Sequence, residues 1–305
     1  MGCFGPSPEP LWVILPYFNF CKFQKRRDLF IKFVNEIKAV PGIKIVVAEV
    51  IGPAPLPKLP VGHHYTFETD STIWLKENLV NMGIRRLPPD WKYVAWIDAD
   101  ISFLNRNWVQ DTIRELRSYD VVQMWQTCVN LGPTDEAIKI DKSFGFMHQG
   151  SGTAYTPTDR YGHWHPGYAW ACTQKAWKQM DGLIDWAILG SGDRHMAMGL
   201  IASVLASAPG NINKNYKTLL ETFERNSRGL EVSYVNGTIL HHWHGRFKDR
   251  RYRERWSILT ENNFDPFDDI GATKDGFIQF TKKGRRLEKA LQEYFIERRE
   301  DSVEI

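Results

Sequence analysis

The stretch Tyr93-Val-Ala-Trp-Ile-Asp98-Ala-Asp100-Ile-Ser-Phe103 decides how this sequence is interpreted. Its apolar, β-forming start predicts a buried strand, and two carboxylates follow two positions apart before apolar residues return. Alternate side chains of a strand face the same side, so we expect Asp98 and Asp100 to project together. Adjacent carboxylates repel each other unless a cation lies between them, and such hard oxygen ligands suit Mg²⁺ or Mn²⁺. The stretch therefore predicts a metal site that can hold phosphate oxygens; a solvated acidic turn is the simpler alternative.

Composition indicates a soluble globular protein. The 305 residues are 43% hydrophobic and 25% charged, which suffices for one large domain or two tightly packed ones. The net charge of +3 permits an anionic ligand without requiring nucleic acid. The four cysteines show neither disulfide nor metal-site spacing, so we expect a cytoplasmic setting, the host cytoplasm if the protein is viral. The apolar segment 11–20 is too short to cross a bilayer, so no membrane is expected.

The chain before the acidic stretch predicts a βαβ unit. A strand at 11–15, a helix with apolar positions between Phe23 and Val40, and a strand at 43–51 follow one another. This order favours a mostly parallel sheet covered by helices. Further expected elements are helices at 73–82, 108–117, 168–180, 196–205 and 284–299, strands at 121–124 and 232–242, and a binding or lid loop at 144–167.

A histidine cluster follows the predicted strand at 232–242. If that strand continues, His242 and His244 share a face, and one imidazole can complete a divalent-ion site begun by two carboxylates. The choice between them stays open, and the other histidines then only bond to the backbone.

Six of the ten residues from 246 to 255 are Lys or Arg. We expect Arg246, Lys248 or Arg251 to clamp a diphosphate, because the planar guanidinium fork fits phosphate oxygens. The alternatives are a solvated face or contact with an anionic acceptor such as nucleic acid. Lys76, on the predicted helix at 73–82, can also reach a phosphate; a surface lysine is the default interpretation.

Two glycine-containing segments supply the remaining candidates. Asp193 follows a Gly-Ser-Gly turn, where an aspartate serves either as a helix N-cap or as the general base that deprotonates an acceptor hydroxyl. Gly167 can bring the backbone against a ligand, beside the stacking faces of Trp164 and Trp170. Core packing is the alternative for Trp170.

Together these features resemble a glycosyltransferase of the GT-A type. The order of motifs over residues 11–256 is similar to that of β-1,4-galactosyltransferases and family-2 inverting enzymes, and to glycosyltransferase-like proteins of tailed phages and bacteria. The resemblance implies an α/β fold with a single Rossmann-like, mixed and mostly parallel sheet flanked by helices. It also implies Mn²⁺ or Mg²⁺ as cofactor, with Asp98-Ala99-Asp100 as the D-x-D motif and Asp100 as the closer ligand.

The resemblance and the motifs assign roles to individual residues. Asp193 is the expected catalytic base, although acidic neighbours typical of the galactosyltransferase turn are replaced by Arg194 and His195. The expected metal ligands are Asp98, Asp100, His242 and His244. The residues expected to contact the nucleotide sugar are Pro16, Tyr17, Asn19, Lys76, Asp98, Ala99, Gly167, Arg246, Lys248 and Arg251. The acceptor or lid residues are His148, Trp164, His165 and Trp170.

The domain organisation follows from the same resemblance. We expect a tail at 1–10, a catalytic domain at 11–256 and a helical extension at 257–305. Within the catalytic domain, 11–125 form the nucleotide-binding half and 126–256 the acceptor and catalytic half.

The expected activity is transfer of a hexosyl or pentosyl group from a nucleoside-diphosphate sugar, a UDP-sugar being favoured, with inversion. The acceptor is a glycan, a lipid-linked sugar, a protein or a hydroxymethylated base of phage DNA; the mild net charge argues against a large duplex footprint. A sugar nucleotidyltransferase would carry a glycine-rich phosphate loop after the first strand, where Pro16-Tyr-Phe-Asn19 stands. A non-catalytic sugar-binding module would have no need for the aspartates and histidines together.

Overall fold

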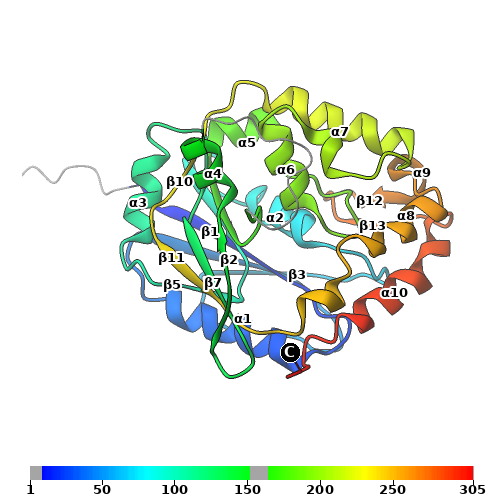
Figure 1. Cartoon of the computed structure of the whole chain (residues 1–305), viewed down its shortest axis with the longest axis horizontal. Helices are drawn as coiled ribbons and strands as arrows, with labels where there is room; N and C mark the ends of the chain where they lie inside the picture. Colours follow the sequence, from blue (N-terminus) through cyan, green and yellow to red (C-terminus); the bar gives the residue numbers. More distant parts are fainter. Residues whose placement is uncertain (1–8, 152–163, 305) are drawn as a thin grey trace, which may run out of the picture.

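A seven-stranded mixed sheet forms the centre of the molecule (Figure 1). The computed structural model describes residues 9–151 and 164–304. The strand order is β10-β6-β9-β4-β1-β2-β3, and β9 alone runs antiparallel to its neighbours in this sheet of the described chain. The strands are β1 (Leu11–Tyr17), β2 (Ile43–Val50), β3 (His63–Phe67), β4 (Tyr93–Ile97), β6 (Val121–Gln123), β9 (Ala169–Thr173) and β10 (Val232–Tyr234). The predicted α/β fold with a mostly parallel sheet is confirmed.

Helices cover both faces of this sheet. Successive side chains of β1 alternate between two apolar clusters: Trp12 and Ile14 enter one, while Leu11 and Val13 enter the other. The helices of the described chain are α1 (Gln24–Ile37), α2 (Lys76–Ile84), α3 (Trp108–Glu115), α4 (Phe144–Ser151), α5 (Gln174–Met180), α6 (Gly192–Leu200), α7 (Lys214–Ser227), α8 (Ser257–Glu261), α9 (Pro266–Asp269) and α10 (Glu288–Glu297). The apolar faces of α1 and α3 pack into the second cluster, and those of α2, α6 and α7 pack into the first.

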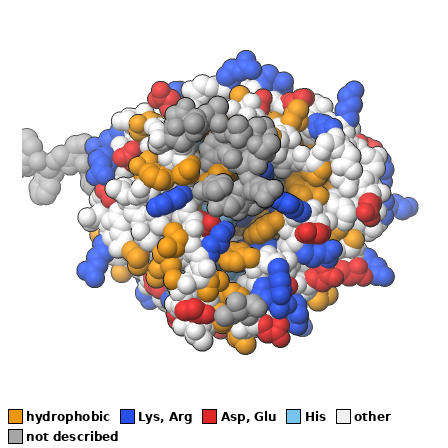
Figure 2. All heavy atoms as spheres, viewed as in Figure 1, with side chains coloured by type: hydrophobic (Ala, Val, Ile, Leu, Met, Phe, Trp, Pro, Cys, Tyr) orange, Lys and Arg blue, Asp and Glu red, His pale blue; other side chains and the backbone are white. Residues whose placement is uncertain are grey.

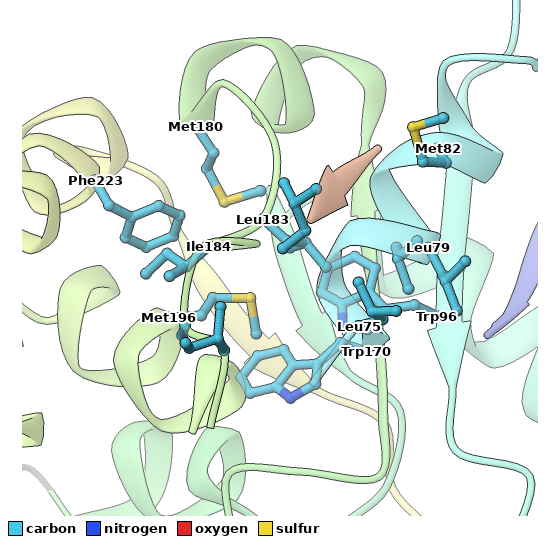
Figure 3. Packing of buried hydrophobic residues seen from close by; sticks show 14 of the residues in the cluster. Leu75, Leu79, Met82, Trp96, Trp170, Met180, Leu183, Ile184, Met196 and Phe223 are labelled. Carbon is cyan, nitrogen blue, oxygen red and sulfur yellow. The ribbon is translucent and has the colours of Figure 1, made fainter. Parts of the chain in front are cut away.

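The first cluster shows why the central strands carry large apolar residues. Trp96 of β4 and Trp170 of β9 are paired across the sheet and fully buried, and Leu79 of α2 and Met196 of α6 pack around them (Figure 3). A strand covered by helices on both faces carries apolar residues continuously rather than alternately. This explains the uninterrupted apolar runs of β1 and β4.

A second, four-stranded sheet adjoins the first and was not predicted. Its order is β5-β11-β7-β8, formed by β5 (Ile101–Phe103), β7 (Thr127–Leu131), β8 (Ala137–Lys142) and β11 (Thr238–His241). The single strand predicted at 232–242 is therefore wrong. It divides into β10 and β11, which join different sheets, with Gly237 at φ +152° between them.

Two further expectations are corrected. The first half of the helix predicted at 168–180 is strand β9, because Ala169–Thr173 fills the sheet between β4 and β6. The loop predicted at 144–167 begins instead with α4, while residues 152–163 lie outside the described residues, so the predicted lid stays a prediction.

The C-terminal segment is part of the main apolar core. Besides the helices α8, α9 and α10 it contains the hairpin of β12 (Ile270–Ala272) and β13 (Ile278–Phe280), which the sequence did not predict. Phe277, Leu287 and Leu291 are buried in the first cluster. In the described residues, no helix has the length and apolar character that crossing a bilayer requires.

Candidate active site

A cavity of about 440 Å³ opens where β1 and β4 end. Pro16 and Tyr17 line it from the end of β1, and the acidic turn after β4 lines it opposite Lys76 of α2. Binding sites of α/β proteins form at the carboxyl ends of parallel strands. On the face seen in Figure 2, Lys and Arg side chains lie among apolar side chains around the centre.

The two aspartates of the opening motif point to different partners. β4 ends at Ile97, so Asp98 and Asp100 lie in the turn before β5. The prediction that they project together from one strand face is therefore wrong. Asp98 Oδ1 lies 2.7 Å from Lys76 Nζ, whereas Asp100 Oδ2 lies 2.9 Å from His244 Nε2. The turn therefore serves two neighbouring centres instead of one.

Asp100, His241 and His244 form a cluster suited to a metal ion. Their ligand atoms all lie within 4.8 Å of one another, and His241 Nε2 lies 3.2 Å from His244 Nε2. Asp100 Oδ1 is buried and has no hydrogen-bond partner among the described residues, which is costly unless a cation satisfies it. One carboxylate and two imidazoles suit Mn²⁺ and related divalent ions, so these residues fit the cofactor that the sequence predicted.

The surroundings prepare His241 as a ligand. Its Nδ1 lies 3.0 Å from Asn130 Oδ1, which also accepts a hydrogen bond from Tyr168 Oη at 2.9 Å. Because an amide oxygen only accepts, His241 carries its proton on Nδ1 and turns the lone pair of Nε2 toward Asp100 and His244. Burial holds the pKa of His241 well below its usual value, which keeps the imidazole neutral as a ligand must be.

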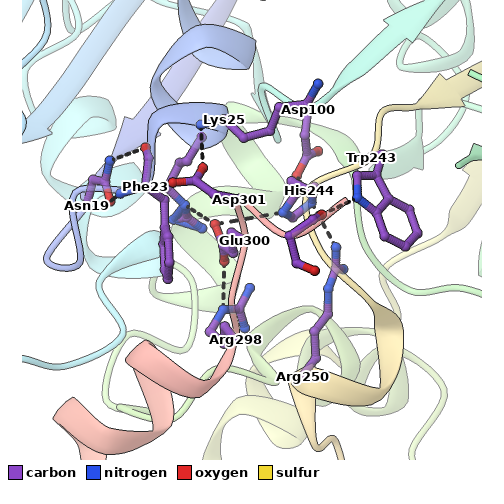
Figure 4. A network of polar contacts seen from close by, with 12 residues as sticks. Asn19, Phe23, Lys25, Asp100, Trp243, His244, Arg250, Arg298, Glu300 and Asp301 are labelled. Carbon is purple, nitrogen blue, oxygen red and sulfur yellow. Dashed lines mark hydrogen bonds and ion pairs between the residues drawn. The ribbon is translucent and has the colours of Figure 1, made fainter. Parts of the chain in front are cut away.

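His244 is shared between the cluster and a cation. Arg250 Nη2 lies 2.8 Å from His244 Nε2 (Figure 4). The pKa of Asp100 is raised by burial but lowered more by His244, His241 and Arg250, so the net effect is a pKa well below the usual value. Asp100 is therefore ionised at neutral pH. An ion bound at His244 Nε2 requires the Arg250 guanidinium to withdraw from that nitrogen.

His242 does not join this cluster. Since β11 ends at His241, the expectation that His242 and His244 share a strand face is wrong. His242 Nε2 lies 2.8 Å from Ser102 Oγ and 3.2 Å from Lys32 Nζ. The sequence argument missed His241 because it carried the two-residue alternation of a strand on to His244. The strand ends at His241, and the chain that follows it brings His241 and His244 to the same cluster.

Lys76 joins the acidic turn to the Gly-rich turn. Its buried Nζ lies 2.7 Å from Asp98 Oδ1 and 2.9 Å from Asp193 Oδ2. Burial lowers the pKa of Lys76, but Asp193 and Asp98 outweigh this and raise it above its ordinary value. Lys76 is therefore a fixed cation at neutral pH and not the surface lysine of the default interpretation.

Asp193 lies in the first turn of α6 but does not cap it. The N-cap residue is Ser191, whose side chain makes no capping bond. A Cβ added to Gly167 would lie 3.3 Å from Asp193 Oδ2, so the glycine leaves space beside this carboxylate. Asp193 lines the cavity, and Lys76 holds its carboxylate there.

Two neighbouring carboxyl groups hold protons more tightly than usual. Burial, with Asp193 adding to it and Lys76 opposing it, raises the pKa of Glu77 to about 8. Burial likewise raises the pKa of Asp98 to about 6 despite the ion pair with Lys76. Of the two, Asp98 lines the cavity, and a perturbed carboxyl group in a cavity is typical of catalytic sites.

The cations predicted to clamp a diphosphate are not those that line the cavity. Arg246 Nε pairs with Asp249 Oδ2 at 2.9 Å, Arg251 pairs with Glu297, and Lys248 is exposed. The cations that do line the cavity besides Lys76 are Arg26, Lys139, Arg194, Arg250, Arg255 and Arg298. The basic segment folds as two short 3-10 turns, whose side-chain directions a strand or α-helix pattern does not reveal.

The other expected site residues divide into two groups. Those that line the cavity are Pro16, Tyr17, Ala99, His165 and Gly167. Those that do not line it are Asn19, His148, Trp164 and Trp170. Asn19 Oδ1 accepts a hydrogen bond from the Phe23 N–H, and His148 stacks on Phe144. Trp164 and Trp170 are buried. Trp170 thus takes the core-packing alternative.

A carboxylate of the C-terminal segment lies beside the Asp100–His241–His244 cluster. Glu300 Oε2 lies 3.8 Å from His244 Nδ1, and Glu300 also pairs with Arg298 at 2.7 Å and Arg26 at 2.9 Å (Figure 4). Its pKa is raised by burial but lowered more by Arg26 and Arg298, so it is ionised. A carboxylate behind a metal-binding imidazole fixes the orientation of the ring.

We expect Glu300→Gln to weaken Mn²⁺ binding by about 10- to 100-fold, because His244 loses the charge that orients it. Isothermal titration of the folded variant with Mn²⁺ measures this. Glu304→Gln, which removes an exposed carboxylate paired with Arg246, is the matched control. Equal affinity in both variants would remove Glu300 from this role.

Comparisons with known proteins give similarity at the level of solved structures. No family model and no curated protein matches the sequence. Drosophila β-1,4-galactosyltransferase 7, solved with manganese, UDP-Gal and xylobiose, is similar at 12% identity and a TM-score of 0.44, over 90% of this chain and 94% of that one. Glucosyl-3-phosphoglycerate synthase from Mycobacterium tuberculosis, solved with Mg²⁺ and UDP, is similar at 11% identity and a TM-score of 0.39, over 90% and 88%.

A third similar structure is not named as a sugar transferase. The 4-diphosphocytidyl-2C-methyl-D-erythritol synthase from Anaerococcus prevotii is similar at 13% identity and a TM-score of 0.34, over 75% of this chain and 89% of that one. All three similarities have TM-scores below 0.5.

Proposed function

We propose that this protein is a metal-dependent glycosyltransferase that moves a sugar from a nucleoside-diphosphate sugar, a UDP-sugar being favoured, to an acceptor hydroxyl. One observation carries the proposal: the cavity holds the Asp100–His241–His244 cluster beside a separate carboxylate, Asp193. A transferase needs positive charge for the leaving diphosphate and a base for the acceptor, and this cavity offers residues for both.

In this proposal the Asp100–His241–His244 cluster binds the donor. Asp100, His241 and His244 would hold Mn²⁺ or Mg²⁺, which when bound neutralises charge on the diphosphate. Arg250, which withdraws from His244 Nε2 when an ion binds there, would add positive charge where negative charge develops on the leaving group. Pro16 and Tyr17, at the end of β1, line the part of the cavity proposed for the nucleotide.

The acceptor side belongs to Asp193. Its carboxylate accepts the proton of the acceptor hydroxyl while that oxygen bonds to the anomeric carbon. The bond from this carbon to the diphosphate oxygen breaks, and the nucleoside diphosphate leaves with the electron pair. Attack opposite to the leaving group inverts the anomeric configuration. Lys76 holds Asp193 in place through the 2.9 Å contact.

The acceptor is proposed to be a glycan or a small sugar in preference to a hydroxymethylated base in duplex DNA. Duplex binding rests on many phosphate contacts by free surface cations. Arg246 and Arg251, from the basic segment, are both paired with carboxylates, which reduces the charge that this surface can offer.

The test is stabilisation by nucleotide sugars. We expect UDP or another nucleoside diphosphate to raise the melting temperature only with Mn²⁺ or Mg²⁺, because a bound ligand stabilises by about 2.7 kcal/mol at 100 times its Kd. Release of nucleoside diphosphate from the matching nucleotide sugar then establishes transfer or hydrolysis. Pyrophosphate release from a nucleoside triphosphate and a sugar phosphate would instead indicate a nucleotidyltransferase, and the absence of any stabilisation would contradict the proposal.

A further inference from the structure

Arg255 is a buried cation that lacks an anionic partner. It is 4% exposed and lines the cavity. Its Nη1 donates to Tyr294 Oη at 2.9 Å and its Nη2 to Ser191 Oγ at 2.6 Å, while Nε has no hydrogen-bond partner. Among the described residues no carboxylate lies within 4.0 Å of this guanidinium. A buried charge without a counter-ion is costly, so an anion from a ligand is the expected partner.

A second guanidinium meets the same phenol. Arg298, which is 5% exposed and also lines the cavity, donates to Tyr294 Oη at 3.1 Å and lies over the ring of Trp74 at 5.3 Å. Its one carboxylate, Glu300, is shared with Arg26. Two like charges therefore converge on a neutral oxygen, and an anion placed between them would relieve their repulsion.

The N-terminus of α6 lies beside Arg255. The turn before this nine-residue helix has positive φ at Gly190 (+87°) and Ser191 (+77°). A Cβ on Gly190 would lie 3.6 Å from Arg255 Nη1 and 3.4 Å from Trp74. The unpaired N–H groups of a helix N-terminus favour anions. Because Asp193 stands in this first turn, an anion here would lie close to the proposed base.

Four of the other six cations that line the cavity have carboxylate partners. Lys76 pairs with Asp98 and Asp193, Arg26 and Arg298 share Glu300, and Lys139 pairs with Asp141. Arg255 has no such partner among the described residues, so a ligand anion beside it would supply the missing countercharge.

We propose that Arg255, with Arg298 and Ser191 beside it, binds an anionic group of the acceptor, so that the acceptor is a sugar or small molecule carrying a phosphate or a carboxylate. The assignment of this anion to the acceptor rests on the proposed function. The group would lie beside α6, where Asp193 can reach a hydroxyl of the same molecule. The competing assignment is that Arg255 contacts the diphosphate of the donor.

The experiment is a calorimetric titration of the protein with sulfate and with acetate at constant ionic strength, with and without saturating UDP and Mn²⁺. Sulfate represents a phosphate on the acceptor, and acetate represents a carboxylate. We expect the anion that binds more tightly to bind at the same time as UDP and Mn²⁺. Its affinity should fall at least fivefold in Arg255→Met and stay unchanged in Arg253→Met. Arg253 is an exposed guanidinium from the same segment and is the matched control.

Three results would overturn the proposal. The first is displacement of the anion by UDP and Mn²⁺, which would assign Arg255 to the donor. The second is equal anion affinity in Arg255→Met and the parent protein, and the third is no binding of either anion. If Arg255→Met does not fold, Ser191→Ala and Arg255→Lys replace it, with a smaller loss expected for both. If UDP with Mn²⁺ does not bind, the proposed function fails, while the titration of the free protein still tests the anion site.

Discussion

Replacing Asp100 with alanine is expected to abolish Mn²⁺ binding and to lower sugar transfer by about 10³-fold, since loss of several kcal/mol of charge stabilisation has this effect. Asp100 is the one carboxylate of the cluster, and its Oδ2 lies 2.9 Å from His244 Nε2 and 3.9 Å from His241 Nε2. Mn²⁺ titration and the rate of nucleoside diphosphate release measure the two effects separately.

The control for Asp100 is Asp90→Ala, because Asp90 is an exposed aspartate outside the cavity. Both variants are compared by thermal unfolding without metal, so that a loss of folding is not mistaken for a loss of binding. If transfer persists in Asp100→Ala and also in a chelator, the metal-dependent mechanism is wrong.

Asp193→Asn is expected to lower kcat for transfer by between about 10² and 10⁴-fold while the affinity for the donor stays within about twofold. Asparagine keeps the size of the side chain but cannot accept the proton of an acceptor hydroxyl. Lys76 retains its ion pair with Asp98 in this variant, so the local packing is preserved. Single-turnover transfer and titration with UDP and Mn²⁺ separate chemistry from binding.

Asp98→Asn is the informative companion to this variant. Asp98 is the other carboxylate on Lys76, and burial raises its pKa to about 6, so it is a competing base. Loss of transfer in Asp98→Asn together with full transfer in Asp193→Asn would assign the base role to Asp98. The opposite pattern supports Asp193.

The sequence predicted the first βαβ unit well because its signals are local. The apolar run of β1, the helical spacing of α1 and the turn at Gly42, where φ is +86°, need no distant partner to be interpreted. The sequence also placed Asp98-Ala-Asp100 at the end of a strand and Gly190-Ser-Gly-Asp193 at the start of a helix. Both predictions depend on the chemistry of consecutive residues.

The assignment of each histidine and arginine was less successful because it depends on where elements end. The assumption that the strand continues to His244 selected His242 in place of His241, because β11 ends at His241. In the basic segment, the cations that line the cavity are Arg250 and Arg255, and their directions are set by two 3-10 turns packed against the C-terminal segment.

The sequence by itself determined a mostly parallel α/β sheet, an acidic turn at the end of a central strand, and the residue types of the proposed metal–diphosphate site. Only the tertiary structure decided that Asp98 and Asp100 have different partners and that His241 completes the cluster. It also decided that Arg298 of the C-terminal segment lines the cavity and that Glu300 lies beside His244. The physical reason is that side-chain direction at an element's end, and contact between residues as distant in the chain as Arg26 and Glu300, are set by packing of the whole core rather than by neighbouring residues.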